Sequence, residues 1–437
     1  MSWKDNGMRA AFYTLGCKVN QYDTDAMAEL FEAAGYTRVD FSEAADVYVI
    51  NTCSVTQMSD KKSRQMISRA HTLAPDAAII VTGCYAQRAP EEVLTLPGVT
   101  VVSGTKDHAK VLEAARTAVQ AGGSLNLVED IGAQREFENA RATKENRTRA
   151  TLKIQDGCDN YCAYCIIPYT RGHIRSRSLQ SVREELEALA REGYREVVLT
   201  GIHLMSYGKD LGGETTLLDA IRQAEGIDGI DRIRLSSLEP QAFSDEALAY
   251  LSGNPQICRH FHLSLQSGSD AVLRRMNRRY TARQYALCAE RIRRAMPDCA
   301  ITTDVIVGFP GETREEFEES LAFVERMAFA RIHVFPYSRR QGTRAAAFPA
   351  QITNAVKSER VRAMIACGNR LEQAFLKSMV GTVQEVLPEE QADEEALEGY
   401  SGNYARVRFN APGSLLGIPR SVYIHAAKDG KLIGKMI

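Results

Sequence analysis

The first 120 residues alternate short apolar runs with helix-length segments. The runs at 8–14, 47–51, 78–82 and 99–102 are predominantly apolar, as expected of strands that are buried on both faces of a parallel sheet. Helical patterns such as 25–34 and 61–73 lie between them. We therefore predict a small parallel α/β domain over residues 1–125, followed by a charged linker over residues 126–149.

Residues 150–375 repeat a strand–helix unit. Strands are expected at 151–155, 196–201, 232–236, 261–266, 302–308 and 331–337. Parallel strands with intervening helices predict a partial (β/α)6 barrel, in which ligand chemistry takes place at the C-terminal ends of the strands.

After a helical stretch at 354–379, the pattern changes to short strand-like pieces at 380–387, 405–409 and 421–426, separated by Gly and Pro turns. This pattern predicts a small antiparallel β-barrel over residues 376–437, a shape that is common among RNA-binding appendages.

Composition adds limits to this picture. The chain is 44% hydrophobic and 25% charged with a net charge of −1, which is ordinary for a globular protein. Any RNA-binding surface must therefore be local. No apolar run reaches the roughly 20 residues of a membrane helix, and the N-terminus lacks a signal-peptide layout. We expect a cytoplasmic protein without a membrane partner.

Three cysteines follow the first strand of the expected barrel, with the spacing C-x3-C-x2-C: Cys158, Cys162 and Cys165. Three thiolates on one loop can ligate three irons of a [4Fe–4S] cluster and leave the fourth iron open. A structural zinc ion needs a fourth ligand, and His173, eight residues on, is poorly spaced for it. Tyr164 is placed to pack beside a cluster and a bound adenine. The motif resembles the radical S-adenosylmethionine superfamily, whose reduced cluster cleaves S-adenosylmethionine to a 5′-deoxyadenosyl radical.

A second set of cysteines lies in the first domain, each just past an apolar strand: Cys17, Cys53 and Cys84. They can converge at one edge of the sheet, where buried thiols and a metal site are both compatible with the pattern. With the downstream triplet and the terminal barrel, their local sequences resemble the radical S-adenosylmethionine methylthiotransferase family. Its members have a cluster-binding N-terminal domain, a radical domain and a C-terminal TRAM domain. The resemblance implies that this set holds a second [4Fe–4S] cluster with one free iron, where sulfur is delivered and methylated.

Within the family, LGCKVNQY at 15–22, NTCSVT at 51–56 and KSRQ at 62–65 are most similar to the MtaB-type branch. That branch acts on N6-threonylcarbamoyladenosine at position 37 of tRNA, next to the anticodon. The similarity implies replacement of the C–H at adenine carbon 2 by C–S–CH3 with two S-adenosylmethionine molecules. The implied partners are the tRNA anticodon loop, an electron donor such as a flavodoxin-type protein, and a sulfur source.

Three alternatives stay open at this point. Two keep the chemistry and change the substrate, to isopentenyladenosine in tRNA or to an aspartate of a ribosomal protein. The third is a zinc-stabilised RNA-binding protein without catalysis.

Polar groups at the strand ends are candidates for holding the cofactor. The family's cofactor positions map to Glu239, Gln266 and Asp304, with Gly308 and Gly311 allowing the adenine to approach the backbone. Both carboxylates can also have a purely structural role, because Glu239 can cap a helix and Asp304 can pair with an arginine.

Arginines near the strand ends are candidates for RNA contacts, because arginine binds phosphate bidentately and stacks on bases. A solvated helix face is the alternative for each of them. The candidates are Arg171, Arg175, Arg177, Arg274, Arg275, Arg278 and Arg279.

Overall fold

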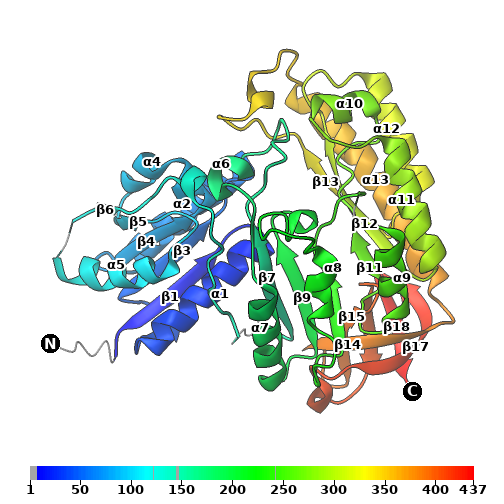
Figure 1. The fold of residues 1–437 in the computed structure, drawn as a ribbon, viewed down its shortest axis with the longest axis horizontal. Coiled ribbons are helices and arrows are strands. Elements are labelled where there is room, and N and C mark those ends of the chain that lie inside the picture. The colour runs from blue at the N-terminus through cyan, green and yellow to red at the C-terminus, as the bar shows by residue number, and fades with distance from the viewer. Residues whose placement is uncertain (1–6, 122, 144–146, 242) are drawn as a thin grey trace.

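The computed structural model describes residues 7–121, 123–143, 147–241 and 243–437, and Figure 1 shows its three parts: an N-terminal sheet, a partial barrel and a C-terminal barrel. This arrangement confirms the predicted fold class. Of the helices in the described ranges, none is both long and apolar enough to cross a membrane.

The N-terminal part is a parallel six-stranded sheet with the order β2-β1-β3-β4-β5-β6. Its strands are β1 (Arg9–Thr14), β2 (Thr37–Val39), β3 (Val47–Thr52), β4 (Ala78–Gly83), β5 (Val99–Val102) and β6 (Leu125–Asn126). The helices α1 (Lys18–Ala33) and α5 (His108–Ala121) pack on one face, and α2 (Gln57–Leu73) and α4 (Pro90–Leu94) pack on the other. Because both faces are covered, β3 and β4 are buried along their whole length, which explains their unbroken apolar sequences.

The central part contains the six expected parallel strands in two sheets, β10-β9-β7-β8 and β11-β12-β13. These strands are β7 (Arg149–Asp156), β9 (Glu196–Gly201), β10 (Arg232–Leu235), β11 (His260–His262), β12 (Ala300–Val307) and β13 (Arg331–Pro336), with the short antiparallel β8 (Arg175–Ser176). Single bridges, Ile233 to Ile257 and Leu238 to Leu263, connect the two sheets.

Helices cover the outer face of this partial barrel. They are α7 (Leu179–Arg191), α8 (Leu217–Arg222), α9 (Asp245–Gly253), α10 (Asp270–Arg275), α11 (Ala282–Ala295) and α12 (Arg314–Met327), whereas the short α6 (Ile167–Arg171) lies in the connection between β7 and β8. Phe261 and Leu263 pack with helix residues in one large core. Because side chains alternate along a strand, the neighbouring His260 and His262 face the opposite side, which we call the barrel interior.

The long helix α13 (Asn354–Ser378) leads into a closed barrel with the order β14-β15-β16-β18-β17. Its strands are β14 (Val383–Gln391), β15 (Ala396–Ser401), β16 (Arg406–Asn410), β17 (Arg420–Lys428) and β18 (Lys431–Met436). The sequence did not predict β15 and β18. The barrel also differs from the antiparallel expectation at one seam, because β16 pairs with β18 in parallel.

The segment expected as a linker is packed against both of its neighbours in the described residues. The Tyr22 hydroxyl of α1 donates to the carbonyl of Ala140 at 2.7 Å, and the amides of Asp107 and His108 donate to the Glu138 carboxylate. These bonds tie the N-terminal sheet to the chain that enters β7.

Candidate functional site

The first cysteine set lies at the C-terminal ends of three adjacent parallel strands. Cys17 follows β1 and precedes α1, Cys53 follows β3, and Cys84 is the first residue of α3 (Cys84–Arg88), directly after β4. Gly16 has a φ of +105°, and a Cβ at this position would lie 2.9 Å from the Cβ of Cys53. Only glycine allows the two loops to approach this closely.

The thiols of this set influence one another. Burial raises the pKa of Cys84 to about 11, against the opposing charge of Arg171 and with the added repulsion of Cys53 and Cys17. Burial likewise raises the pKa of Cys53. Such thiols become thiolates when a metal supplies positive charge. The donor set therefore suits a bound metal centre better than free anionic sulfur.

The second set follows β7 in a loop held by glycine and backbone hydrogen bonds. Gly157 has a φ of +72°, and a Cβ there would lie 1.9 Å from the carbonyl oxygen of His173. The amide of Cys158 donates to the carbonyl of Gly172 at 3.0 Å, and that of Cys165 to the carbonyl of Cys162 at 2.9 Å. Burial raises the pKa of Cys158 to about 11 and that of Cys165 to about 12.

The spacing of the sulfur atoms bears on the kind of metal centre. Among the described residues, His262, Asp304 and His333 form the one group of three potential ligands whose atoms all lie within 4.8 Å of one another. Neither cysteine set is that tight. A tetrahedral zinc ion would hold sulfurs about 3.8 Å apart, from Zn–S bonds of about 2.3 Å. In either set, the sulfurs would have to move closer together to bind a single zinc ion.

Glu239 lies beside the second cysteine set in a polar network. One carboxylate oxygen lies 3.2 Å from Nε2 of His203, and the other lies 2.9 Å from a guanidinium nitrogen of Arg278. Another nitrogen of Arg278 lies 3.3 Å from the sulfur of Cys162. Burial alone would raise the pKa of Glu239, but the hydrogen bond from His203 and the charge of Arg278 outweigh it and lower the pKa. Glu239 is therefore an anion next to the cysteine loop.

Gln266, Asp304, Tyr164 and Cys165 line one cavity of about 260 Å³. Gln266 has a φ of +68°, a conformation that is uncommon for residues other than glycine and often marks a functional site. The strand β11 ends at His262, earlier than predicted, although Gln266 still forms an isolated parallel bridge to Val305 of β12. Gly308 and Gly311 lie in the turn after β12, both with positive φ, and neither lines this cavity.

Asp304 contacts histidines in place of the arginine considered from the sequence. Its carboxylate lies 3.2 Å from Nε2 of His262, and His333 is its direct neighbour on β13. His203, His262 and His333 were not predicted from the sequence. The signal was their position, because each lies on, or two residues after, a predicted barrel strand.

The structure corrects the expectation that Arg171, Arg175 and Arg177 bind RNA. All three side chains are buried. Arg171 and Arg175 pair with Asp156 at 3.0 and 3.7 Å, and Arg177 pairs with Glu185 at 2.5 Å. A guanidinium that is enclosed by protein and paired with a carboxylate is not accessible to a phosphate.

The arginines of α10 and its C-terminal loop divide into two groups. Arg278 faces Glu239 and Cys162, as described above, and Arg275 donates to the Glu316 carboxylate at 2.9 Å. Arg274 and Arg279 are exposed and stay candidates for RNA contact.

Two family models match the chain, over the same parts that carry the cysteine sets. The model described as "Uncharacterized protein family UPF0004" matches residues 9–104, and the model of the radical SAM superfamily matches residues 152–324.

Solved structures share the fold at low sequence identity. The radical S-adenosylmethionine methyltransferase TsrM from Kitasatospora setae, with cobalamin and a [4Fe-4S] cluster bound, superposes with a TM-score of 0.56 and 16% identity. The match covers 86% of this chain and 80% of that one.

Curated relatives are similar over nearly the whole chain. The threonylcarbamoyladenosine tRNA methylthiotransferase MtaB of Bacillus subtilis is 43% identical, over 93% of this chain and 91% of its own. The MtaB of Thermotoga maritima is 36% identical, over 96% of this chain and 95% of its own. A tRNA-2-methylthio-N(6)-dimethylallyladenosine synthase of Acetivibrio thermocellus is 34% identical, over 97% and 90%. Identity of this extent, together with both family matches, shows that this chain belongs to the radical S-adenosylmethionine methylthiotransferase family.

Proposed function

We propose that this enzyme converts N6-threonylcarbamoyladenosine at position 37 of tRNA to its 2-methylthio derivative, with two molecules of S-adenosylmethionine. The observation that carries this proposal is the order of similarity among the relatives. Those named for threonylcarbamoyladenosine are 36–43% identical, whereas those named for dimethylallyladenosine are 33–35% identical.

Each cysteine set would hold one [4Fe–4S] cluster. Cys158, Cys162 and Cys165 each supply one thiolate to the first, and Cys17, Cys53 and Cys84 do so for the second. When bound, the clusters would supply the electron that opens S-adenosylmethionine to a carbon radical and a free iron where sulfur is methylated. Radical chemistry suits this substrate because the C–H bond at adenine carbon 2 is not acidic enough for an ordinary base.

The side chains around the second cysteine set would bind and orient S-adenosylmethionine. The Glu239 carboxylate is a hydrogen-bond acceptor for an amine or a ribose hydroxyl, and His203 and Arg278 hold it in place. Gln266 and Asp304 present polar groups to the cavity, and the ring of Tyr164 offers an apolar wall for the adenine. Gly308 and Gly311 leave the following turn without side chains.

The macromolecular partners follow from the same proposal. The anticodon loop would dock where Arg274 and Arg279 are exposed. A flavodoxin-type protein would deliver the electron, and a separate sulfur source would reload the first cysteine set.

The test is mass analysis of tRNA nucleosides from a strain that lacks the gene. We expect 2-methylthio-N6-threonylcarbamoyladenosine to disappear and its precursor, N6-threonylcarbamoyladenosine, to accumulate. The native gene should restore the product, and a matched gene with the three substitutions Cys158→Ala, Cys162→Ala and Cys165→Ala should not. Persistence of the product, or loss of the methylthio dimethylallyl nucleoside in its place, would contradict the proposal.

A further inference from the structure

The substrates of the two classes of relatives differ in the group on N6 of the adenine. A threonylcarbamoyl group carries a carboxylate and a hydroxyl, whereas a dimethylallyl group is entirely apolar. An enzyme that selects the first must therefore place a cation where the N6 group lies, because an anion moved out of water needs a charged partner.

The location of that cation is restricted by the reaction. Carbon 2 must meet the sulfur that is delivered at Cys17, Cys53 and Cys84. In the adenine ring a single nitrogen, N1, separates carbon 2 from carbon 6, which carries the N6 group. The carboxylate of the substrate is thus expected close to the first cysteine set.

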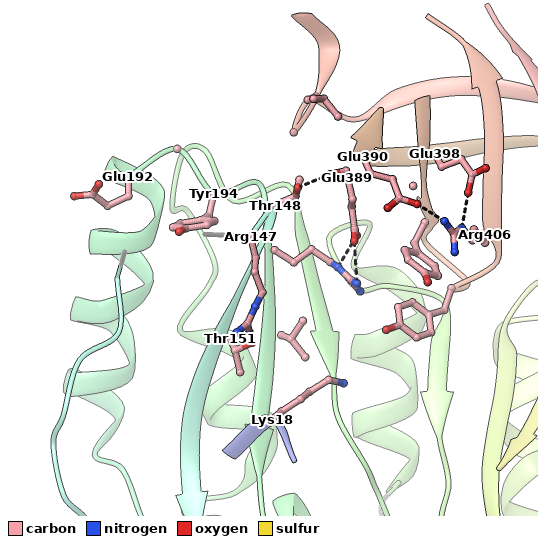
Figure 2. Close-up of a pocket in the computed structure, with 18 residues that line it drawn as sticks. Lys18, Arg147, Thr148, Thr151, Glu192, Tyr194, Glu389, Glu390, Glu398 and Arg406 are labelled. Carbon is pink, nitrogen blue, oxygen red and sulfur yellow. Dashed lines mark hydrogen bonds and ion pairs between the residues drawn. The ribbon is translucent and has the colours of Figure 1, made fainter. Parts of the chain in front are cut away.

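Lys18 follows Cys17 directly in the chain and begins α1. It is an exposed residue, and its exposed surface faces a hollow of about 890 Å³ at the N-terminal ends of β7 and β9. Figure 2 shows Lys18 at one end of this hollow, next to Thr151, with Glu390 and Arg406 at the other end. The charge of Lys18 also acts on His260 and His333 of the barrel interior.

The other cations in this region are already paired. Arg149 binds Glu389 at 2.6 Å, Arg234 binds Glu196 at 2.6 Å, and Lys153 binds Asp23. Within the described ranges, no carboxylate lies within 4.0 Å of the Lys18 ammonium group, although the more distant charge of Glu196 acts on it. Lys18 is therefore a cation next to the first cysteine set that is available for a ligand anion.

We propose that Lys18 binds the carboxylate of the threonylcarbamoyl group and thereby selects this substrate over dimethylallyladenosine. This inference rests on the proposed function and adds a residue that distinguishes its substrate. Lys18 acts in binding: its ammonium group donates hydrogen bonds to the carboxylate and holds the adenine with carbon 2 toward the first cysteine set.

The experiment compares the native enzyme with Lys18→Gln, Lys18→Arg and the exposed control Lys110→Gln, each reconstituted and assayed for iron and sulfide. Three anticodon stem-loops serve as substrates, carrying threonylcarbamoyladenosine, its carboxyl methyl ester or dimethylallyladenosine. Binding is measured by fluorescence anisotropy without S-adenosylmethionine, and KM and kcat are measured in the complete reaction.

For Lys18→Gln we expect a Kd and KM for the threonylcarbamoyl stem-loop that are roughly ten- to a hundredfold higher, the range for a hydrogen bond to a charged group. Lys18→Arg should recover part of this loss, and Lys110→Gln should lose nothing. The native enzyme should bind the methyl ester as weakly as Lys18→Gln binds the acid. The variant should not distinguish acid from ester.

The outcomes separate the two proposals. If the native enzyme methylthiolates only the dimethylallyl stem-loop, the proposed function and this inference both fail. If it accepts the threonylcarbamoyl stem-loop but binds acid and ester equally well, only the role of Lys18 fails. Loss of iron in Lys18→Gln with unchanged binding of the stem-loop would also overturn it, because Lys18 would then support the cluster.

Discussion

Replacement of Asp23 by asparagine should destabilise the protein strongly, although the side chain keeps its shape. Asp23 lies on α1, and its carboxylate is buried. It pairs with Lys153 on β7 and, at 2.8 Å, with Arg171 on α6. Asp156 is the second carboxylate of this buried cluster, and Arg175 is its third cation. The substitution leaves three buried cations with one carboxylate.

The magnitude follows from the burial of every member. Removing one partner of a buried ion pair typically costs about 3–5 kcal/mol, because the remaining charge stays out of water without compensation. Asp23 has two direct partners, so we expect the upper part of that range. Stabilities of whole domains are about 5–15 kcal/mol, so the loss would be a large fraction of the total. It would also weaken the contact between the N-terminal sheet and the barrel.

The loss should depend on pH in a defined direction. Burial alone would raise the pKa of Asp23, but the charges of Lys153 and Arg171 outweigh it and lower the pKa below its ordinary value of 3.8. A carboxylate with a lowered pKa adds stability above the pKa of the unfolded chain, and this stability is lost as the pH falls through the folded pKa. The difference in the free energy of unfolding between the native protein and the variant should therefore be largest at pH 7 and decrease below about pH 4.

Urea unfolding followed by circular dichroism measures this difference, with m-values compared to check that the transition is of the same kind. The control is Asp245→Asn, which removes a carboxylate on the surface that pairs with Arg291 at 2.6 Å; it should unfold like the native protein. A loss of less than about 1 kcal/mol for Asp23→Asn at pH 7 would refute the argument from burial. An equal loss of stability at pH 7 and pH 3.5 would refute the conclusion that Asp23 is a stabilising anion in the folded protein.

Three further predictions concern the metal sites and the C-terminal barrel. The variant with Cys158, Cys162 and Cys165 all replaced by alanine should keep about half of the iron of the native enzyme, as two clusters of four irons require. Iron and sulfide analysis after anaerobic reconstitution measures the iron content. Complete loss of iron would contradict two separate sites. Gly157→Ala should lose iron from the same site, because its Cβ would overlap the His173 carbonyl, whereas Gly213→Ala, where nothing lies within 4 Å, should keep it. Tyr404→Ala should destabilise the C-terminal barrel by about 2 kcal/mol, because the ring contacts two guanidinium groups and each such contact contributes roughly 0.5–2 kcal/mol. The ring centre lies 4.6 Å from the guanidinium of Arg234 and 5.2 Å from that of Arg149. Limited proteolysis should therefore be faster for Tyr404→Ala and unchanged for the exposed control Tyr423→Ala.

The sequence predicted the parallel sheet and the partial barrel because their strands are buried and therefore apolar. It missed β15 because Glu398 and Gly399 interrupt the apolar alternation. The structure gives the reason for the glycine: a Cβ at Gly399 would lie 1.9 Å from the carbonyl oxygen of Leu387. A close crossing inside a small barrel thus requires a residue that weakens the local strand signal.

The cysteine sets were also predictable, because their spacing and their positions after strands are local properties. The buried arginines were not. A cluster of arginines after the triplet has the same appearance whether it faces RNA or a carboxylate, and one of the two acidic partners of Arg171, Asp23, lies 148 positions earlier in the chain. Lys18 and the histidines of the barrel interior were missed for the same reason, because their surroundings form only when distant strands and helices come together.

The interactions of Arg171 bear on how the two cysteine sets are placed relative to each other. Its guanidinium donates to the side-chain oxygen of Asn20 at 2.5 Å, and Asn20 in turn donates to the carbonyls of Leu15 and Thr52, which flank the loops of Cys17 and Cys53. The same guanidinium binds Asp156, whose other carboxylate oxygen accepts from the amide of Gly157 at 2.8 Å, directly before Cys158.

One buried side chain therefore connects the loops of both sets. Under the proposed function, a radical formed at one site and a sulfur delivered at the other must reach the same adenine, and reactions between separately bound groups are sensitive to displacements of about 1 Å. A rigid link between the two loops satisfies this requirement, whereas two domains joined only by a flexible linker would not. This need explains why Arg171 is buried between the loops of the two cysteine sets, bound to Asn20 on one side and to Asp156 on the other.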